Sequence, residues 1–302
     1  MQPFADQEIG HMRVERLYAS YRSYLLALAY RMLGSVSDAE DVVQELFAAV
    51  HEERLPNVSN LKAYLAKAVT RRCLNVRKSA VKRRVTYVGQ WLPEPWMRTA
   101  DSTMEEVERR DDVSYAFLVM LEKLTPLERA VLVLREAFDY DYAEIADLLD
   151  KTEAACRKML SRAKKKLGDR DAQPDPYHPR GERQLVQKWV SALASGKIED
   201  ILDLIAEDAV LVTDGGGKVR SAINPIFGRT RVAALLKTLA TRKFENARLH
   251  VERINGACGI VAVENDRVIG VACFDWNADG TVRRLYAVLN PEKLSRIVPG
   301  KN

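Results

Sequence analysis

The chain has 302 residues, of which 47% are apolar, and its 47 lysine and arginine residues exceed its 42 acidic residues to give a net charge of +5. The length exceeds what one hydrophobic core usually holds, so two or three domains are expected, and the apolar fraction argues against extended disorder. No apolar run is long enough to cross a bilayer and no signal-peptide layout opens the chain, so we expect a cytoplasmic protein without a membrane segment. The four cysteines and four histidines are scattered without ligand spacing, so no metal site, cofactor or disulfide framework is expected.

Residues 14–85 form the first region, in which apolar side chains recur at three- and four-residue spacing. This period predicts helices with one buried face. Gly34 is expected to end the first helix. Ser37, with Glu40 three residues later, has the spacing of a capping box and predicts the start of a second helix. A third helix is expected to follow and to lead into a basic segment.

Charged residues are gathered into blocks of one sign. The segment from Lys62 to Arg84 contains nine basic residues and no acidic residue, and a second basic cluster lies within residues 157–166. Acidic residues are concentrated at 38–53 and at 101–112. Blocks of opposite sign suggest separate surfaces for separate partners, and the basic ones would attract phosphate. Any single block is also compatible with a solvated helix face.

Helical spacing returns at residues 113–167. Thr125 followed by Pro126 predicts an N-cap and a first-turn proline. Further on, a polar turn at 150–153 separates two short predicted helices. This is the outline of a helix-turn-helix, whose second helix enters the major groove of DNA. Two short helices with a tight turn also occur in plain helical bundles, so the pattern alone leaves both interpretations open.

Residues 87–112 are predicted to be a linker, because they combine glycine, prolines and acidic residues. Within this linker, residues 91–96 place two tryptophans around a stiff Pro-x-Pro core. Exposed aromatic area is unfavourable, so this segment is expected to pack against a domain, either its own or another.

The last region, from about residue 181 to 294, changes to strand-like periodicity after two amphipathic helices. A third helix is expected near residues 230–240, and the strands are expected to form a curved antiparallel sheet packed on helices, an α+β fold. The predicted helices before the sheet are residues 185–194 and 198–205. The predicted strands are residues 209–213, 218–223, 249–254, 259–264, 268–275 and 282–289.

The helical motifs resemble a known family. Residues 38–47 (DAEDVVQELF) closely resemble the polymerase-binding segment of region two in extracytoplasmic-function sigma factors. Residues 60–65 and the basic helix after them resemble the part of region two that reads the minus-ten box. Residues 124–129 and 142–146 resemble region four, whose recognition helix reads the minus-thirty-five box. The resemblance covers about the first 170 residues in the order and spacing of the family.

Three further motifs resemble the signatures of a subgroup that carries a fused SnoaL-like domain after region four. They are residues 91–95 (WLPEP), 214–218 (DGGGK) and 290–294 (NPEKL). Glu292 stands where that signature usually has aspartate. Members of the subgroup are regulated by their own C-terminal extension, so the resemblance implies the same here.

The resemblance implies a sigma factor that binds core RNA polymerase and promoter DNA, acts without a membrane partner and is a monomer when free. A small-molecule ligand of the C-terminal domain is possible, although no residue identifies it. The implied domains are region two at 1–86, a linker at 87–112, region four at 113–172 and a SnoaL-like regulatory domain at 181–295.

Individual residues take their expected roles from these motifs and from their charge. The candidates for polymerase binding are Asp38, Asp41, Gln44 and Glu45. The candidates for DNA binding are Asn60, Lys62, Arg71, Arg72, Asn75, Arg83, Arg84, Arg157, Lys158 and Arg162. The candidates for regulatory interdomain contacts are Trp91, Leu92, Pro93, Glu94, Pro95, Asp214, Gly215, Gly216, Gly217, Lys218, Asn290, Pro291, Lys293 and Leu294.

Two other interpretations remain open. The first is a transcriptional regulator that uses the helix-turn-helix without polymerase. The second is an enzyme fused to a DNA-binding module, because SnoaL-like relatives include isomerases and cyclases with an acidic or histidine general base. Asp214 and Asp275 are the candidates for such a base, but neither has an identifiable partner in the sequence. We therefore expect a regulatory module and no enzyme.

Overall fold

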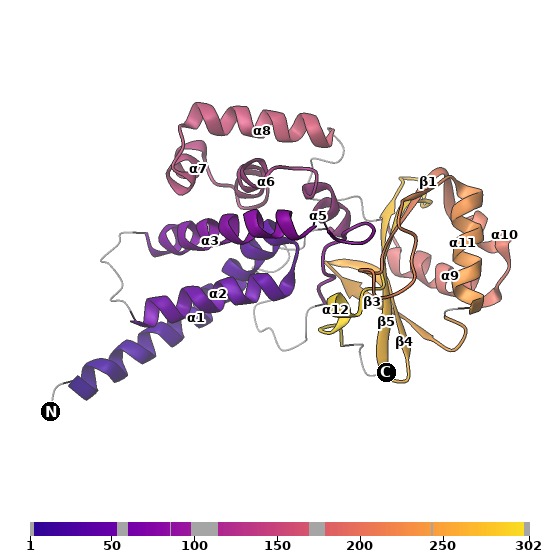
Figure 1. The fold of residues 1–302 in the computed structure, drawn as a ribbon, viewed down its shortest axis with the longest axis horizontal. Helices are drawn as coiled ribbons and strands as arrows, with labels where there is room; N and C mark the ends of the chain where they lie inside the picture. The colour runs from indigo at the N-terminus through magenta and orange to yellow at the C-terminus, as the bar shows by residue number, and fades with distance from the viewer. Residues whose placement is uncertain are drawn as a thin grey trace. The chain divides into compact units, whose positions relative to one another are not determined.

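The computed structural model describes residues 3–52, 60–84, 86–97, 114–168, 179–242 and 244–298. The chain folds into two compact units (Figure 1). The first unit comprises Met1–Arg83 together with Met120–Gln173, and the second comprises Arg84–Val119 together with Pro174–Asn302. The described part of the predicted linker therefore lies in the second unit, with the sheet.

Three long helices, α1 (Pro3–Leu33), α2 (Val36–Glu52) and α3 (Leu61–Arg84), make up the first part of unit one. Gly34 separates α1 from α2 with a positive φ of 70°, a conformation that glycine adopts without strain. The predicted cap of α2 is wrong. Ser35 rather than Ser37 begins the helix, because its Oγ accepts a hydrogen bond from the backbone N–H of Asp38 at 3.1 Å.

The second part of unit one contains α6 (Pro126–Leu132), the π-helix η1 (Val133–Ala137), α7 (Tyr142–Leu149) and α8 (Glu153–Leu167). The predicted N-cap at Thr125 and first-turn proline of α6 are confirmed. The predicted turn is also present: Asp150 ends α7 in the left-handed conformation and Thr152 caps α8. Helices α7 and α8 therefore have the connectivity of a helix-turn-helix.

Unit two is built on a six-stranded sheet in the order β2-β1-β6-β5-β4-β3. Its helices are α5 (Tyr115–Leu121), which continues into unit one, α9 (Glu182–Ser195), α10 (Ile198–Leu202), α11 (Arg229–Arg242) and α12 (Pro291–Leu294). Its strands are β1 (Ile205–Asp214), β2 (Ile226–Phe227), β3 (Arg248–Ile254), β4 (Ala257–Glu264), β5 (Arg267–Trp276) and β6 (Val282–Val288).

The predicted α+β class is confirmed, with two departures in the sheet. Strands β3 to β6 pair antiparallel as expected, but β1 pairs with β6 in parallel, so the sheet is mixed. A long connection through α11 and four strands separates β1 from β6, and this allows the parallel pairing. The strand predicted at 218–223 is wrong: Gly216 and Gly217 have positive φ and extend the turn, and the next strand is β2.

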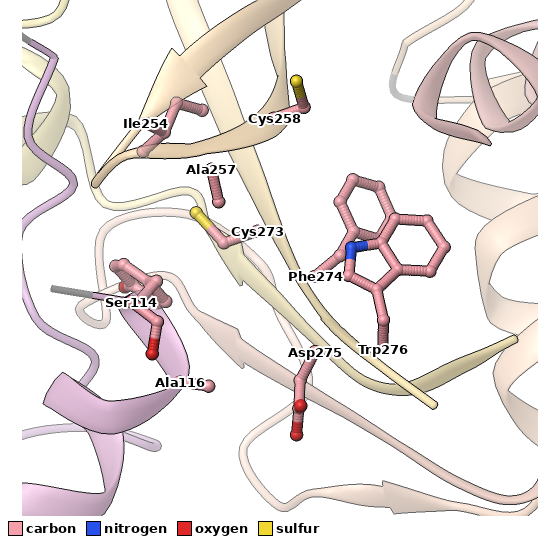
Figure 2. A pocket seen from close by; sticks show the side chains of 10 residues that line it. Ser114, Ala116, Ile254, Ala257, Cys258, Cys273, Phe274, Asp275 and Trp276 are labelled. Carbon is pink, nitrogen blue, oxygen red and sulfur yellow. The ribbon is translucent and has the colours of Figure 1, made fainter. Parts of the chain in front are cut away.

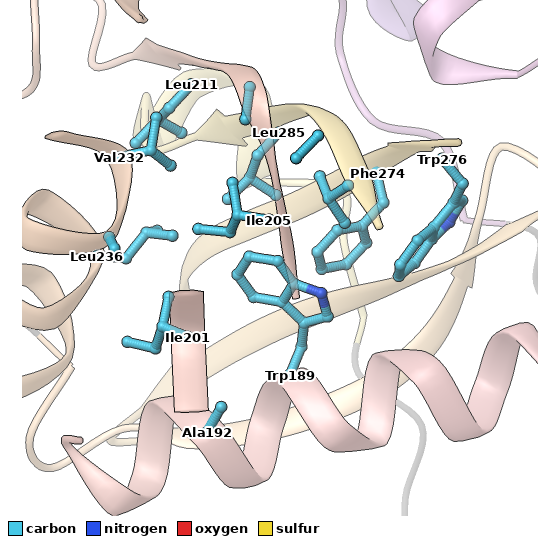
Figure 3. Close-up of a cluster of buried hydrophobic side chains, with 14 of the residues drawn as sticks. Trp189, Ala192, Ile201, Ile205, Leu211, Val232, Leu236, Phe274, Trp276 and Leu285 are labelled. Carbon is cyan, nitrogen blue, oxygen red and sulfur yellow. The ribbon is translucent and has the colours of Figure 1, made fainter. Parts of the chain in front are cut away.

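The two faces of the sheet are covered by different parts of unit two. One face packs on α9, α10 and α11 around Trp189, Ile201, Leu236 and Phe274 (Figure 3). The other face packs on Leu92 of the linker, Tyr115 of α5, and Leu294 of α12. The linker and the C-terminal tail therefore belong to the same hydrophobic core.

Candidate polymerase and promoter surfaces and the signature network

The amphipathic helix α2 presents its carboxylates away from the core of unit one. Val42, Val43, Leu46 and Phe47 are buried, as the helical period requires. On the opposite side the candidate polymerase-binding residues Asp41, Gln44 and Glu45 are exposed, and Asp38 is half-buried beside the Ser35 cap.

The candidate minus-ten residues on α3 differ in how accessible they are. Lys62, Arg71 and Asn75 are exposed, whereas Arg72 is half-buried. Asn60 has a structural role, because its Oδ1 accepts a hydrogen bond from the N–H of Ala63 at 3.0 Å and so caps α3. The backbone of Arg83 and Arg84 belongs to α3, but their side chains lie outside the described residues.

Two basic side chains of α3 are ion-paired with carboxylates of α7 and the helix-turn-helix turn, within unit one. Lys67 Nζ lies 2.8 Å from Asp147 Oδ2, and Arg71 Nη2 lies 2.5 Å from Asp150 Oδ2. Asp147 and Asp150 are largely exposed, so these pairs lie at the surface. Arg71, which was expected to contact promoter DNA, is thus ion-paired with a carboxylate of the same chain.

A buried cluster of three charges joins the same parts of unit one. Glu122 accepts hydrogen bonds from Arg77, with Nη2 to Oε2 at 3.0 Å, and from Arg129 Nη1. The side chains of Arg77 and Arg129 are 3% and 0% exposed, and that of Glu122 is 16% exposed. Arg129 Nε also donates to the carbonyl oxygen of Arg31 at 2.7 Å. The sequence analysis counted Arg77 in a basic block that would attract phosphate, but its guanidinium is buried against Glu122.

The candidate minus-thirty-five residues lie on the exposed face of α8. Arg157, Lys158 and Arg162 are all exposed. Arg157 is held from two sides, by an ion pair with Glu153 at 2.6 Å and by stacking over the Tyr142 ring at 4.5 Å. Lys158 and Arg162 extend the same cationic face by one more turn.

The buried carboxylate of Asp214 brings the three signature segments together in unit two. Asp214 is 0% exposed, and its Oδ2 accepts from Lys293 Nζ at 2.7 Å and from the N–H of Leu92 at 2.9 Å. Its Oδ1 accepts from the hydroxyl of Tyr87 at 2.6 Å and from the N–H of Gly216 at 3.0 Å. Burial, together with this hydrogen bond to Asp214, raises the pKa of Tyr87 above its ordinary value. We call Asp214, Lys293, Leu92, Tyr87 and Gly216, together with Asn290, the signature network.

Lys293 and Asn290 complete the signature network from the C-terminal tail. Lys293 Nζ also donates to the carbonyl oxygen of Leu92 and lies 4.0 Å from the centre of the Trp91 ring, a cation–π contact. Asn290 Nδ2 donates to the Tyr87 hydroxyl at 2.9 Å. Gly216 has a positive φ of 61°, and a Cβ there would lie 2.3 Å from Asn290 Nδ2, so the turn needs glycine.

The other signature residues surround the signature network. Tyr115 donates its hydroxyl to the carbonyl oxygen of Pro93 at 2.7 Å, and Lys218 forms an exposed ion pair with Glu292. Leu294 is buried in the core beneath. Tyr87 is the member that sequence reasoning missed, because it lies four residues before the recognisable motif. Pro95, Gly215 and Gly217 belong to the same segments, Pro95 and Gly215 buried and Gly217 exposed, while Glu94 is half-buried and Pro291 exposed.

Asp275, the second candidate general base, is an ion-pair partner on the sheet. Its Oδ2 lies 2.7 Å from Arg283 Nη2. Figure 2 shows its carboxylate pointing away from the rings of Phe274 and Trp276. The hollow beside it has a volume of only about 10 Å³. This is room for about one water molecule, so a substrate does not fit there.

Two family models match the chain. The Sigma-70 region 2 model matches residues 17–83, and the Sigma-70, region 4 model matches residues 114–167. The first match contains the exposed carboxylates of α2 and the basic residues of α3, and the second contains the helix-turn-helix. Together they define a sigma factor of the sigma-70 class.

Relatives match over nearly the whole chain. The ECF RNA polymerase sigma factor SigJ of Mycobacterium tuberculosis (strain H37Rv) is 30% identical over 292 residues, which cover 92% of each chain. The probable ECF RNA polymerase sigma factor SigI of Mycobacterium tuberculosis (strain CDC 1551) is 26% identical and covers 94% of this chain and 96% of SigI. The crystal structure of the Mycobacterium tuberculosis SigJ superposes with a TM-score of 0.73 at 28% identity, covering 93% of this chain and 98% of SigJ.

The chain belongs to the extracytoplasmic-function (ECF) RNA polymerase sigma factors. The family resemblance and the fold class expected from the sequence are confirmed, and the comparisons favour the sigma-factor interpretation over both alternatives. In the part of the chain that the structure describes, no helix has the length and apolar character that crossing a membrane requires.

Proposed function

We propose that the chain binds core RNA polymerase through the exposed carboxylates of α2 and reads two promoter elements with α3 and α8. We further propose that the ion-paired form of unit one is a resting state that must open. The observation that carries this proposal is the pairing of Arg71 with Asp150 and of Lys67 with Asp147, which joins the two DNA-reading parts directly.

Promoter geometry explains why unit one must open. The minus-ten and minus-thirty-five boxes are separated by about 25 base pairs, or roughly 85 Å of duplex at about 3.4 Å per pair. Helix α3 and the helix-turn-helix are in ion-pair contact, at N–O distances of 2.5 and 2.8 Å. Surfaces in contact cannot occupy two sites that far apart on a straight duplex, so the α3 surface must separate from α7 and α8.

Neutralising the two carboxylates should favour the open form. We expect Asp147→Asn with Asp150→Asn to raise the affinity for a promoter fragment about three- to tenfold, because each exposed ion pair contributes roughly 0–1 kcal/mol. Fluorescence anisotropy with labelled promoter DNA measures the affinity.

The matched control is Glu207→Gln with Asp266→Asn. It changes the net charge equally and also breaks two exposed ion pairs, those with Arg229 and Arg248, but in unit two. An equal gain in affinity for control and test variants would show that charge alone is responsible, and would contradict the resting-state proposal.

The polymerase surface is tested by reversing charge on the exposed face of α2. Asp41→Lys with Glu45→Lys should weaken association with core polymerase at least tenfold, because carboxylates that face a basic partner become repulsive. Both positions are exposed, so the unfolding temperature should stay within a few degrees. Glu199→Lys on α10 with Asp203→Lys at its C-cap is the control at two other exposed carboxylates. Unchanged association of the α2 variant in a pull-down with core polymerase rules out this surface.

We infer that unit two regulates the two promoter-reading regions through the chain that connects them. The residues after α3 enter unit two, where Leu92 and Tyr115 are buried in the core, and α5 then leads back into α6. Leu92, near the start of the connection between the two sigma regions, and Tyr115, just after its end, are therefore both packed in the core of unit two. A change in the signature network acts on that connection directly.

We infer that unit two has no catalytic role in this chain. Asp214 is ion-paired and completely buried, and Asp275 is ion-paired beside a hollow of about 10 Å³. Neither carboxylate is free to take a proton from a substrate. Any turnover by the purified chain that is lost in Asp214→Ala or Asp275→Ala would contradict this inference.

A further inference from the structure

The helix-covered face of the sheet in unit two contains a cavity of about 440 Å³. This is within the range of sites that hold small molecules in proteins. Its walls come from α9, α11 and the sheet, and the residues that carry the argument are Trp189, Phe244, Ala272, Phe274, Ala287 and Leu289.

The cavity exists because small side chains adjoin one another across three strands. In the register of β4 and β5, Ala262 lies opposite Gly270, and in that of β5 and β6, Ala272 lies opposite Ala287. These four residues line the cavity floor. Ala272 and Ala287 remain partly exposed although they lie on inner strands of the sheet. Larger side chains occupy this face two residues further along the same strands, at Phe274 on β5 and Leu285 on β6.

The chemistry of the walls is apolar. Among the described residues that line the cavity, Glu245 has the only charged side chain, and it is exposed to solvent. Asp214 and Asp275 do not line the cavity. Burial of a charge without a partner is strongly unfavourable, so the walls exclude charged groups and accept apolar ones.

One wall of the cavity is joined to the signature network. Leu289 lines the cavity, and its backbone N–H donates to the carbonyl oxygen of Asp214 at 2.7 Å. The next residue, Asn290, donates its N–H to the same carbonyl at 2.9 Å. A Cβ built on Gly270 would lie 3.1 Å from Leu289 Cδ2 and 3.3 Å from Phe244 Cζ. The side chain of Leu289 is therefore closely packed on this side.

We propose that this cavity is a binding site for an uncharged, lipophilic small molecule, and that its occupancy is transmitted through Leu289 to Asn290 and the signature network. The proposal extends the regulatory function proposed above, but its test needs neither polymerase nor DNA. The ligand-binding proposal and the regulatory proposal can therefore be contradicted independently of each other.

The probe for the test is N-phenyl-1-naphthylamine, an uncharged lipophilic fluorophore, titrated into the full chain. We expect saturable binding with energy transfer from Trp189 in the cavity wall and from Trp276, which stacks on the lining residue Phe274. Ala272→Leu and Ala262→Leu each fill the floor of the cavity and should weaken binding at least tenfold. Ala278→Leu makes the same change at an exposed position of the β5–β6 turn and should leave binding unchanged.

Transmission is measured by hydrogen exchange. Saturating probe should change the exchange rates of the Leu289 and Asn290 amides at least threefold in the parent chain and not in Ala272→Leu. Absence of saturable binding, or equal binding by the parent and both filled variants with unchanged unfolding temperatures, would overturn the binding site. Binding without any change in the exchange of these two amides would overturn the transmission.

Discussion

Replacing Lys293 by methionine is expected to lower the free energy of unfolding of unit two by about 3–5 kcal/mol, the usual result of removing one partner of a buried ion pair. Asp214 is 0% exposed, and its Oδ2 would lose the ammonium group at 2.7 Å. The carbonyl oxygen of Leu92 would lose a donor at the same time. Methionine has a similar length, so little cavity is created. Chemical denaturation, followed by tryptophan fluorescence, measures the change.

Lys218→Met is the matched control, because it removes another lysine that is ion-paired within the same set of signatures. Its partner Glu292 and Lys218 itself are 66% and 47% exposed, so the loss should stay within about 1 kcal/mol. If Lys293→Met and Lys218→Met had equal effects, the buried pair would have no special role. The proposed regulation adds a second readout: promoter-dependent transcription with core polymerase should change several-fold in Lys293→Met, at a temperature at which the variant is still folded.

The second large effect is expected at Glu122. Glu122→Gln should destabilise unit one by about 3–5 kcal/mol, because two guanidinium groups that are almost completely buried lose their shared carboxylate. The change in side-chain volume is small, so the loss reports on charge and hydrogen bonding. Thermal unfolding followed by circular dichroism at the helical band measures it.

Glu153→Gln provides the comparison for Glu122. Glu153 pairs with Arg157 four residues later on α8, and both side chains are about half exposed. The expected loss is therefore about 0.5 kcal/mol or less. A loss of less than about 1 kcal/mol in Glu122→Gln would mean that the buried charges find other partners, and that the cluster does not hold the two parts of unit one together.

Local patterns predicted much of the fold. The helical stripes, the Thr125 cap, the polar turn before α8 and most strands depend on residues close in sequence, so their positions could be read from spacing. The predicted cap at Ser37 is wrong because Ser35 and Ser37 both suit an N-cap, and only the exit of the chain from Gly34 decides between them. The parallel pairing of β1 with β6 depends on a long connection, which periodicity does not encode.

The site was predicted less completely, because several of its contacts join residues distant in sequence. The motifs identified Asp214 and Lys293, but not that they pair with each other or with Tyr87. Charge blocks suggested that the basic residues of α3 face DNA, but they could not show that Arg77 is buried against Glu122. The residues that form the cavity were not predicted, because Ala262, Gly270, Ala272 and Ala287 become neighbours only through strand register.

The opening of unit one is the central claim, and single-molecule energy transfer between α3 and α8 tests it most directly. Dyes on Ser79→Cys and Ser161→Cys, both at exposed positions, report the separation. Cys258→Ser removes the one half-exposed native thiol, while burial raises the pKa of Cys73, Cys156 and Cys273 and keeps them unreactive. The free chain should show high transfer, and the complex with core polymerase and promoter DNA should show low transfer, consistent with a separation of more than about 50 Å on roughly 85 Å of duplex. High transfer that persists in a transcriptionally active complex would contradict the account.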